Sequence, residues 1–238
     1  MRLLITRPQP DASISADRLR QLGHEVLISS VLNVTFSNNP LTWHQDMGLV
    51  VTSRNGIRAL STLSTDEMRT KATLFTVGDA TAALAKEAEF KNIISASGDV
   101  DGLVSLIADK KPASTLYICG RDRKSELDAK LQKRGIPVDI AERYHADFAT
   151  SLTKETINAF EKQTLDGVLH YSARSAEAFS LLMKQKIVSY STKQITHFCL
   201  AKAISSVLDR NMGIHAVVAE RPNEQSLCDA IAAYARTC

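Results

Sequence analysis

The sequence predicts an α/β protein with two domains, each built on a parallel β-sheet. Short apolar runs alternate with longer amphipathic stretches along the chain, which is typical of parallel sheets covered by helices on both faces. Segment 2–36 is echoed by segment 115–148: each reads as a strand, a polar turn, a helix, a glycine and a second strand. The length of 238 residues also exceeds one typical domain.

The remaining segments repeat as well. GLVVTSRNGIRAL at 48–60 resembles GVLHYSARSAEAF at 167–179, and LFTVGDATAAL at 74–84 resembles HFCLAKAISSV at 197–207. The chain thus consists of a two-strand segment, a three-strand segment, and then a second copy of each. The two-strand segments are 2–36 and 115–148, and a three-strand segment follows each of them. The alternative is that any two strand–helix stretches look alike because they share one binary pattern. The matched order of the pieces favours a true repeat.

This order predicts a discontinuous first domain. The N-terminal strand pair completes its sheet with the last three strands, and the second domain lies between them, so each sheet has five strands. We expect domain 1 to span 1–32 and 150–238, and domain 2 to span 40–141. The chain then crosses twice between the domains, through a two-stranded β connector at 33–39 and 142–149.

The first half of the chain carries clear start and stop signals. Ile14, Leu19 and Leu22 share one face of a helix that ends at Gly23, and Ser53 can cap the helix that follows it. The expected elements are, in order, strand 2–6, helix 13–22, strands 25–28, 31–36 and 49–52, helix 55–63, strand 73–77, helix 80–88, strand 92–95 and helix 101–108.

The second half repeats the alternation, with apolar runs as buried strands and amphipathic runs as helices. The expected elements are the strand–helix–strand segment 115–148, helix 152–160, strand 167–171, helix 176–183, strand 195–200, helix 201–208, strand 214–218 and helix 224–235.

Composition narrows the class of protein. The hydrophobic content of 44% and charged content of 23% are ordinary for a globular protein, and no apolar run approaches the ~18 residues of a membrane span. The apolar run RLLIT, which ends just before Arg7 and Pro8, is too short for the hydrophobic region of a signal peptide. The four cysteines form no C-x-x-C pair, and Cys119 and Cys199 fit apolar strands. We expect a cytoplasmic protein with no membrane partner, and the net charge of +3 is too weak to indicate nucleic acid.

Ligands of open α/β sheets bind outside the carboxyl ends of the strands. Hydroxyls and cations recur at those positions here, beside helix N-termini that favour anions. The pattern favours a cleft between the domains that holds a multiply charged anion, and the alternative is ordinary solvated loops. The candidate residues are Arg7, Ser53, Arg54, Gly78, Thr81, Gly120, Tyr144, Ser172 and Lys202.

Several signatures are missing from the sequence. Neither G-x-G-x-x-G nor G-x-x-x-x-G-K-[ST] follows a strand, and no serine sits in G-x-S-x-G. The six histidines are scattered without H-x-x-x-H, so we expect no metal site. His170 and His197 fall inside strand patterns and are expected in the core or at a sheet edge, whereas His145 is a candidate functional residue.

Seven motifs, in order, carry a family resemblance: LLITRP, VVTSRNGIRAL, FTVGDATAALA, YICGRDR, ERYHADF, VLHYSARSAEAF and AERPNEQSLCDAI. With these motifs the whole chain resembles the uroporphyrinogen-III synthase family. The resemblance implies two flavodoxin-like domains joined by a β-ladder and no metal or organic cofactor. It also implies the substrate, hydroxymethylbilane, a linear tetrapyrrole with eight carboxylates. The product is uroporphyrinogen III, formed with loss of water and inversion of the terminal ring through a spiro intermediate.

The resemblance also implies roles for the candidate residues. Tyr144 matches the family's functional tyrosine, and its phenol would be catalytic by assisting departure of the substrate hydroxyl. One turn departs from the family pattern: Ala201 replaces a glycine, and Ala203 and Ile204 replace hydroxyl residues, so that Lys202 is left to supply charge. The carboxylate-binding residues implied are Ser53, Gly78, Thr81 and Ser172, with added charge from Arg7 and Arg54.

Two other functions fit a two-domain α/β chain. One is a binding protein that closes on an anionic ligand without chemistry. The other is a two-domain glycosyltransferase, which would require a nucleotide site that the sequence does not reveal. In all three cases we expect a monomer, because two domains already supply a pair of facing surfaces.

Overall fold

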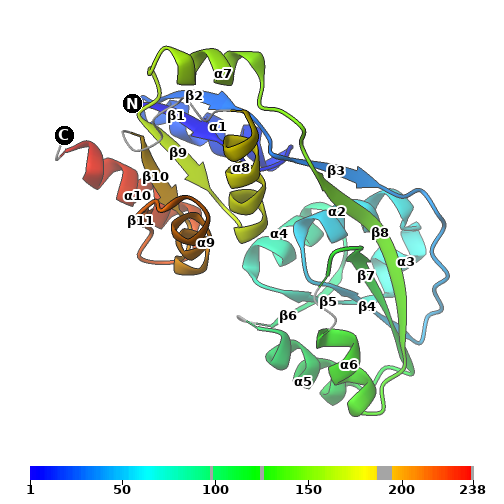
Figure 1. The fold of residues 1–238 in the computed structure, drawn as a ribbon. Helices are drawn as coiled ribbons and strands as arrows, with labels where there is room; N and C mark the ends of the chain where they lie inside the picture. The colour runs from blue at the N-terminus through cyan, green and yellow to red at the C-terminus, as the bar shows by residue number, and fades with distance from the viewer. Residues whose placement is uncertain (97–98, 124–125, 187–194, 237–238) are drawn as a thin grey trace. The chain divides into compact units, whose positions relative to one another are not determined.

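The computed structural model describes residues 1–96, 99–123, 126–186 and 195–236 (Figure 1). The chain divides into two compact units: unit 1 is Met1–Val34 with Asp147–Cys238, and unit 2 is Thr35–Ala146. Both units are α/β with parallel sheets, as the sequence predicted. In the described residues, no helix is both long enough and apolar enough to span a membrane.

The sheet of unit 1 joins the two ends of the chain. Its strands lie in the order β11-β10-β9-β1-β2, and every pairing is parallel. Leu4 at its centre aligns with Leu27 on one side and Val168 on the other, and all three are buried. The prediction that the N-terminal strands share a sheet with the last three is confirmed. The strands are β1 (Arg2–Ile5), β2 (Glu25–Ile28), β9 (Gly167–His170), β10 (Thr196–Cys199) and β11 (Val217–Val218).

Helices cover both faces of this sheet because every strand has apolar side chains on each face. The helices α1 (Asp11–Gln21) and α10 (Glu224–Ala235) pack on one face through residues such as Leu19 and Leu227. On the other face, Phe160 and Phe179 bring together α7 (Lys154–Glu161) and α8 (Ala173–Lys186), with ring centroids 6.5 Å apart. The helix α9 (Lys202–Met212) packs beside α8.

The sheet of unit 2 has the order β3-β8-β7-β4-β5-β6, which is six strands where the sequence predicted five. The sixth strand is β3, which the sequence predicts as one of the two strands of the connector; it lies at the edge of this sheet because its partner β8 also pairs with β7. It runs antiparallel to β8, since Ser37 N donates to Arg143 O while Ala149 N donates to Val31 O. The strands are β3 (Leu32–Phe36), β4 (Met47–Val51), β5 (Thr73–Val77), β6 (Asn92–Ala96), β7 (Ser114–Gly120) and β8 (Val138–Phe148).

The helices of unit 2 also form two layers (Figure 1). One layer contains α2 (Arg54–Leu63), α3 (Asp66–Lys71) and α4 (Asp79–Glu87), which pack over Leu49 and Ile118. The other contains α5 (Val100–Lys110) and α6 (Glu126–Lys133), which pack over Val50 and Tyr117. The sequence did not predict α3.

The two sheets repeat one topology. In each sheet, the first strand of the two-strand segment pairs with the first strand of the three-strand segment. These pairs are β1 with β9 and β7 with β4. The orders β2-β1-β9-β10-β11 and β8-β7-β4-β5-β6 are therefore equivalent. The glycine that ends the helix of each two-strand segment is equivalent too: Gly23 and Gly135 have φ of 84° and 73°, a left-handed conformation that favours glycine.

Candidate functional site

The turn after β4 begins the site in unit 2. β4 is buried along its length, and the chain stays extended through Ser53, with φ −149° and ψ 156°. The Ser53 hydroxyl accepts a hydrogen bond from Gly56 N at 3.0 Å and so caps α2, as the sequence predicted. α2 starts close to the sheet because Gly56 has no side chain: a Cβ there would lie 2.5 Å from Val51.

Tyr144 reaches this turn from β8. Its hydroxyl is hydrogen-bonded to the Ser53 hydroxyl at 2.8 Å. A register shift between Cys119 and Gly120 pairs Gly120 with Tyr144, and a Cβ at Gly120 would lie 2.6 Å from the phenol ring. Gly120 is therefore needed for the tyrosine to lie flat against β7.

Burial and hydrogen bonding have opposite effects on the pKa of the Tyr144 phenol. Burial raises the pKa of the phenol above its usual value, whereas hydrogen bonds from Ser53 and from the Gly120 backbone act to lower that pKa. Gly56 N already occupies one lone pair of Ser53, and the Ser53 proton can point to Tyr144. In that arrangement Tyr144 accepts a hydrogen bond from Ser53, and its own proton is available to a ligand.

A pocket of about 190 Å³ opens beside these residues. The hydroxyl of Tyr117 in its wall is 3.1 Å from the Thr52 hydroxyl. Arg123 lies 2.6 Å from Glu142 and 3.8 Å from Asp128, so its charge is largely balanced. The pocket is lined by Thr52, Val100, Tyr117, Gly120, Arg123, Glu126, Leu127 and Tyr144.

Two further turns of unit 2 carry predicted residues. Gly78 precedes α4 with a φ of 78°, and Thr81 is buried in the first turn of that helix. Arg54 is the first residue of α2. Because β5 is the neighbour of β4, the N-termini of α2 and α4 lie along the same carboxyl edge of the sheet.

In unit 1, Arg7 follows β1 but faces inward. It is 8% exposed, stacks 4.2 Å above the Tyr171 ring and donates to Ser15 at 2.9 Å. Its guanidinium also lies 3.5 Å from Asp11 and 3.7 Å from Glu224. Two carboxylates therefore balance the charge that the sequence suggested for substrate binding.

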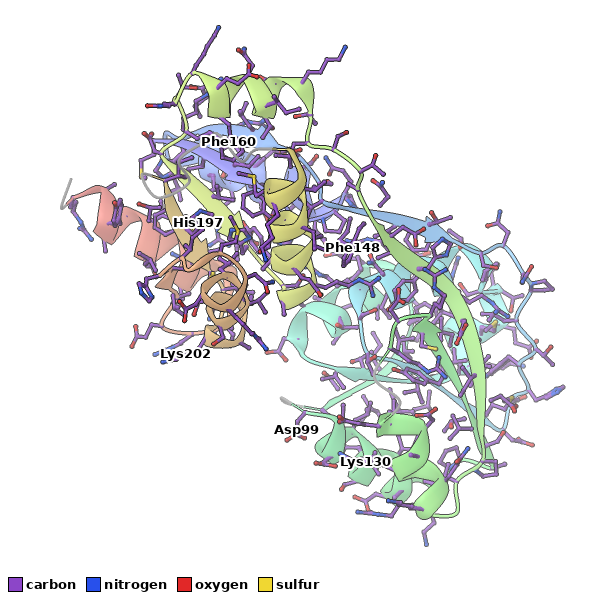
Figure 2. The ribbon with its side chains drawn as sticks, viewed as in Figure 1. Asp99, Lys130, Phe148, Phe160, His197 and Lys202 are labelled. Atoms are coloured by element: carbon purple, nitrogen blue, oxygen red, sulfur yellow. The ribbon has the colours of Figure 1, made fainter. Side chains whose placement is uncertain are left out.

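The other predicted residues of unit 1 begin its helices. The Ser172 hydroxyl accepts from Ser175 N at 3.1 Å, which makes it a helix cap. Lys202 is the first residue of α9, and its side chain is exposed (Figure 2). The preceding Ala201 is extended, with φ −154°, whereas Gly78 is left-handed. The exchange of glycine for Ala201 thus accompanies a different backbone conformation at the equivalent turn.

The two histidines expected in strands are confirmed as core residues. His170 and His197 are fully buried, with His170 Nε2 and His197 Nδ1 2.9 Å apart and the rings stacked at 5.2 Å (Figure 2). Cys119 and Cys199 are buried free thiols, also as expected. Within the ranges that the structure describes, no group of three or more His, Cys, Asp or Glu could hold a metal ion.

Of the predicted residues, the structure brings Ser53, Gly120 and Tyr144 into direct contact. Sequence reasoning missed Thr52, Tyr117 and Arg123, which line the same pocket. A signal for Thr52 was present, because it adjoins Ser53 at the end of a strand. Tyr117 offered no signal, since a tyrosine inside the run TLYIC reads as an ordinary core residue.

Parallel sheets covered by helices on both faces, with helix N-termini along their carboxyl edges, place the protein in the doubly wound α/β class, whose members bind ligands at that edge. The family model of uroporphyrinogen-III synthase HemD matches residues 14–229. The chain therefore belongs to the uroporphyrinogen-III synthase family, whose members are cyclising lyases of tetrapyrrole biosynthesis.

Solved structures are similar in fold. The uroporphyrinogen-III synthetase of Helicobacter pylori superposes with a TM-score of 0.68 at 18% identity, covering 98% of this chain and 100% of that chain. A mutant uroporphyrinogen III synthase of Thermus thermophilus gives 0.60 at 16% identity, with both chains fully covered. No curated protein sequence matches this chain significantly.

Proposed function

We propose that this protein closes hydroxymethylbilane to uroporphyrinogen III, and that Tyr144 assists the departure of the substrate hydroxyl. The observation that carries the role of Tyr144 is that its ring lines the pocket while its hydroxyl is hydrogen-bonded to Ser53. With Ser53 donating to its oxygen, the phenol can direct its proton at the leaving hydroxyl.

The C–O bond of the hydroxymethyl group breaks as the pyrrole nitrogen releases electron density into the ring, and the oxygen leaves as water with the proton of Tyr144. The Ser53 hydroxyl is the group that stabilises the phenolate until it regains a proton. Selectivity depends on orientation, because hydroxymethylbilane also closes by itself without inversion of the terminal ring.

The carboxylates of the substrate need several donors. In unit 2 we assign this role to Ser53, Arg54, Gly78, Thr81 and Gly120, which lie at the carboxyl edge beside helix N-termini. In unit 1 we assign it to Ser172 and Lys202. The ion pairs of Arg7 favour a role in holding the turn after β1 over direct contact with the substrate.

We further propose two flavodoxin-like domains with the limits 1–32 and 150–238, and 40–141, and a connector at 33–39 and 142–149. Two observations support this: the strand order β2-β1-β9-β10-β11 is the flavodoxin order, and the compact units change at 34/35 and 146/147. A monomer in the cytoplasm remains our prediction; the free thiols of Cys119, Cys199 and Cys228 fit a reducing compartment.

The test is to incubate the protein with freshly generated hydroxymethylbilane and to resolve the type I and type III products. We expect the wild type to form mainly the type III isomer. Tyr144→Phe should lower the rate of type III formation roughly 10²-fold, the lower end for loss of a general acid. Tyr234→Phe, on α10 of unit 1, is the matched control and should retain the wild-type rate.

Two results would count against the proposal. A wild-type product mixture identical to that without protein would exclude the cyclase activity. An unchanged rate in Tyr144→Phe would limit this tyrosine to packing against Phe36, whose ring centroid lies 6.3 Å away.

A further inference from the structure

The turn formed by Thr52 and Ser53, which we call the 52–53 turn, is hydrogen-bonded to a tyrosine on each side. Consecutive residues of an extended chain point to opposite faces of a sheet. Ser53 meets Tyr144, which packs on the face that carries Ile57 and Leu60. Thr52 meets Tyr117, whose ring belongs to the other face.

The hydroxyl of Tyr117 lies in an apolar environment, where burying a polar group costs free energy. Its side chain is 4% exposed and packs among Phe75, Leu103 and Leu127, where a phenylalanine would fill the same apolar space without a polar atom. Burial raises the pKa of its phenol, so that the group stays protonated, while the hydrogen bond with Thr52 acts in the opposite direction. A buried hydroxyl needs a partner, and here that partner is Thr52.

We propose that Tyr117 is a positioning residue, which fixes the 52–53 turn through Thr52 and thereby holds Ser53 and Tyr144 in the geometry that selects the type III product. This inference rests on the proposed function of Tyr144. Tyr117 acts from the far side of the turn. Without its hydrogen bond the Thr52 side of the turn loses this restraint, while the Ser53 side keeps its bonds to Gly56 and Tyr144.

A shift in this turn matters more for selectivity than for folding. Ser53 aligns the phenol and also caps α2, so a small rotation at Thr52 changes the direction in which the Tyr144 proton points. Small misplacements of a reacting group reduce rates strongly, whereas the uncatalysed closure to the type I product is unaffected. The type III fraction is thus the quantity that reports on the turn.

The experiment compares Tyr117→Phe, Thr52→Val, Thr52→Ser and the double variant Tyr117→Phe/Thr52→Val. Valine keeps the shape of threonine and lacks its hydroxyl, whereas serine keeps the hydroxyl. The measurements are the type III fraction, kcat and KM, with the thermal unfolding midpoint of each variant as a check on folding. Tyr234→Phe is again the control for loss of a tyrosine hydroxyl.

We expect Tyr117→Phe and Thr52→Val to lower kcat for the type III product roughly three- to tenfold, the effect of one neutral hydrogen bond, with little change in KM. The double variant should be no worse than either single variant, and Thr52→Ser should recover most of the wild-type fraction. Should Tyr117→Phe fail to fold, the two Thr52 variants still decide the matter, because Thr52→Val removes the hydroxyl and keeps the shape, whereas Thr52→Ser keeps the hydroxyl and removes only the methyl group.

The inference is overturned if both single variants keep the wild-type type III fraction and kcat, if their effects multiply in the double variant, or if Thr52→Ser is as impaired as Thr52→Val. These results leave the proposed function intact when the wild type remains selective. A wild-type protein that forms only the type I product would overturn the proposed function, and this inference with it.

Discussion

The phenol of Tyr144 owes its position to the absence of a side chain at Gly120. A Cβ there would lie 2.6 Å from one ring carbon and 2.8 Å from the next, distances that force the ring to move. The backbone at Gly120 has no left-handed φ, so an alanine would be strained by this contact alone. Position 120 therefore requires a glycine because the ring of Tyr144 occupies the space where a Cβ would lie.

We predict that Gly120→Ala lowers type III formation at least tenfold, because the displaced ring loses its hydrogen bond to Ser53. Product resolution after incubation with hydroxymethylbilane measures this. Gly48→Ala is the matched control: its Cβ would lie 2.9 Å from Phe75 in the core, so it should lower the unfolding midpoint and leave the product ratio unchanged. A wild-type ratio in Gly120→Ala would contradict the close contact.

Among the elements, β9 and β10 carry the groups most sensitive to acid. His170 and His197 link these strands in a fully buried site against Phe179. Burial lowers the pKa of His197 from 6.5 to about 4, and burial together with His197 lowers the pKa of His170 well below its usual value. Both rings are therefore neutral in the folded protein.

This neutrality makes folding stability depend on pH. The unfolded chain binds protons near pH 6.5, whereas folded His197 does so only near pH 4, so stability is full above pH 6.5 and falls as the pH drops toward 4. We predict that His197 alone contributes a loss on the order of 3 kcal/mol across this window and that His170 adds to it. Urea unfolding at a series of pH values measures it.

The control for this prediction replaces the pair. His170→Leu/His197→Leu should flatten the pH dependence between about 4 and 6.5. His44→Gln, a change at an exposed histidine, should leave it as in the wild type. An equally steep dependence in the leucine double variant would assign the acid sensitivity to other groups.

Elements with a sustained apolar pattern were predictable from the sequence, and short ones were not. Helix α2 was expected because Ile57 and Leu60 recur at helical spacing and Ser53 caps it. Helix α3 was missed because it has six residues and buries only Met68, too few to show a period. Strand β3 is predicted as a connector strand paired with segment 142–149, and the sequence does not reveal that β8 continues into the sheet beside β7 and so makes β3 its sixth strand.

At the scale of the whole molecule, the small positive net charge favours binding of a substrate that carries eight carboxylates. The net charge is +3, and Arg54 and Lys202 begin helices at the carboxyl edges of the two sheets. We predict that raising the ionic strength from about 0.05 M to about 0.5 M increases KM for hydroxymethylbilane several-fold and changes kcat little, because salt screens exposed charges. Steady-state kinetics over this range test it.

The uncatalysed closure of hydroxymethylbilane over the same salt series is the control for this measurement. A KM independent of ionic strength would indicate that backbone N–H groups and hydroxyls, rather than side-chain charges, provide most of the binding.

The sequence by itself determined the two sheets and the sharing of one sheet by both ends of the chain, and it offered Ser53, Gly120 and Tyr144 as candidate residues, which the structure brings into contact. These features follow from local patterns, namely apolar runs, caps and a repeated order of strands and helices, together with the family motifs. Only the tertiary structure decided that Arg7 is balanced by Glu224 and that Tyr117 meets Thr52. The reason is physical: such contacts join residues distant in the chain, and a side chain's partner depends on which face of the sheet it occupies and on where each strand ends.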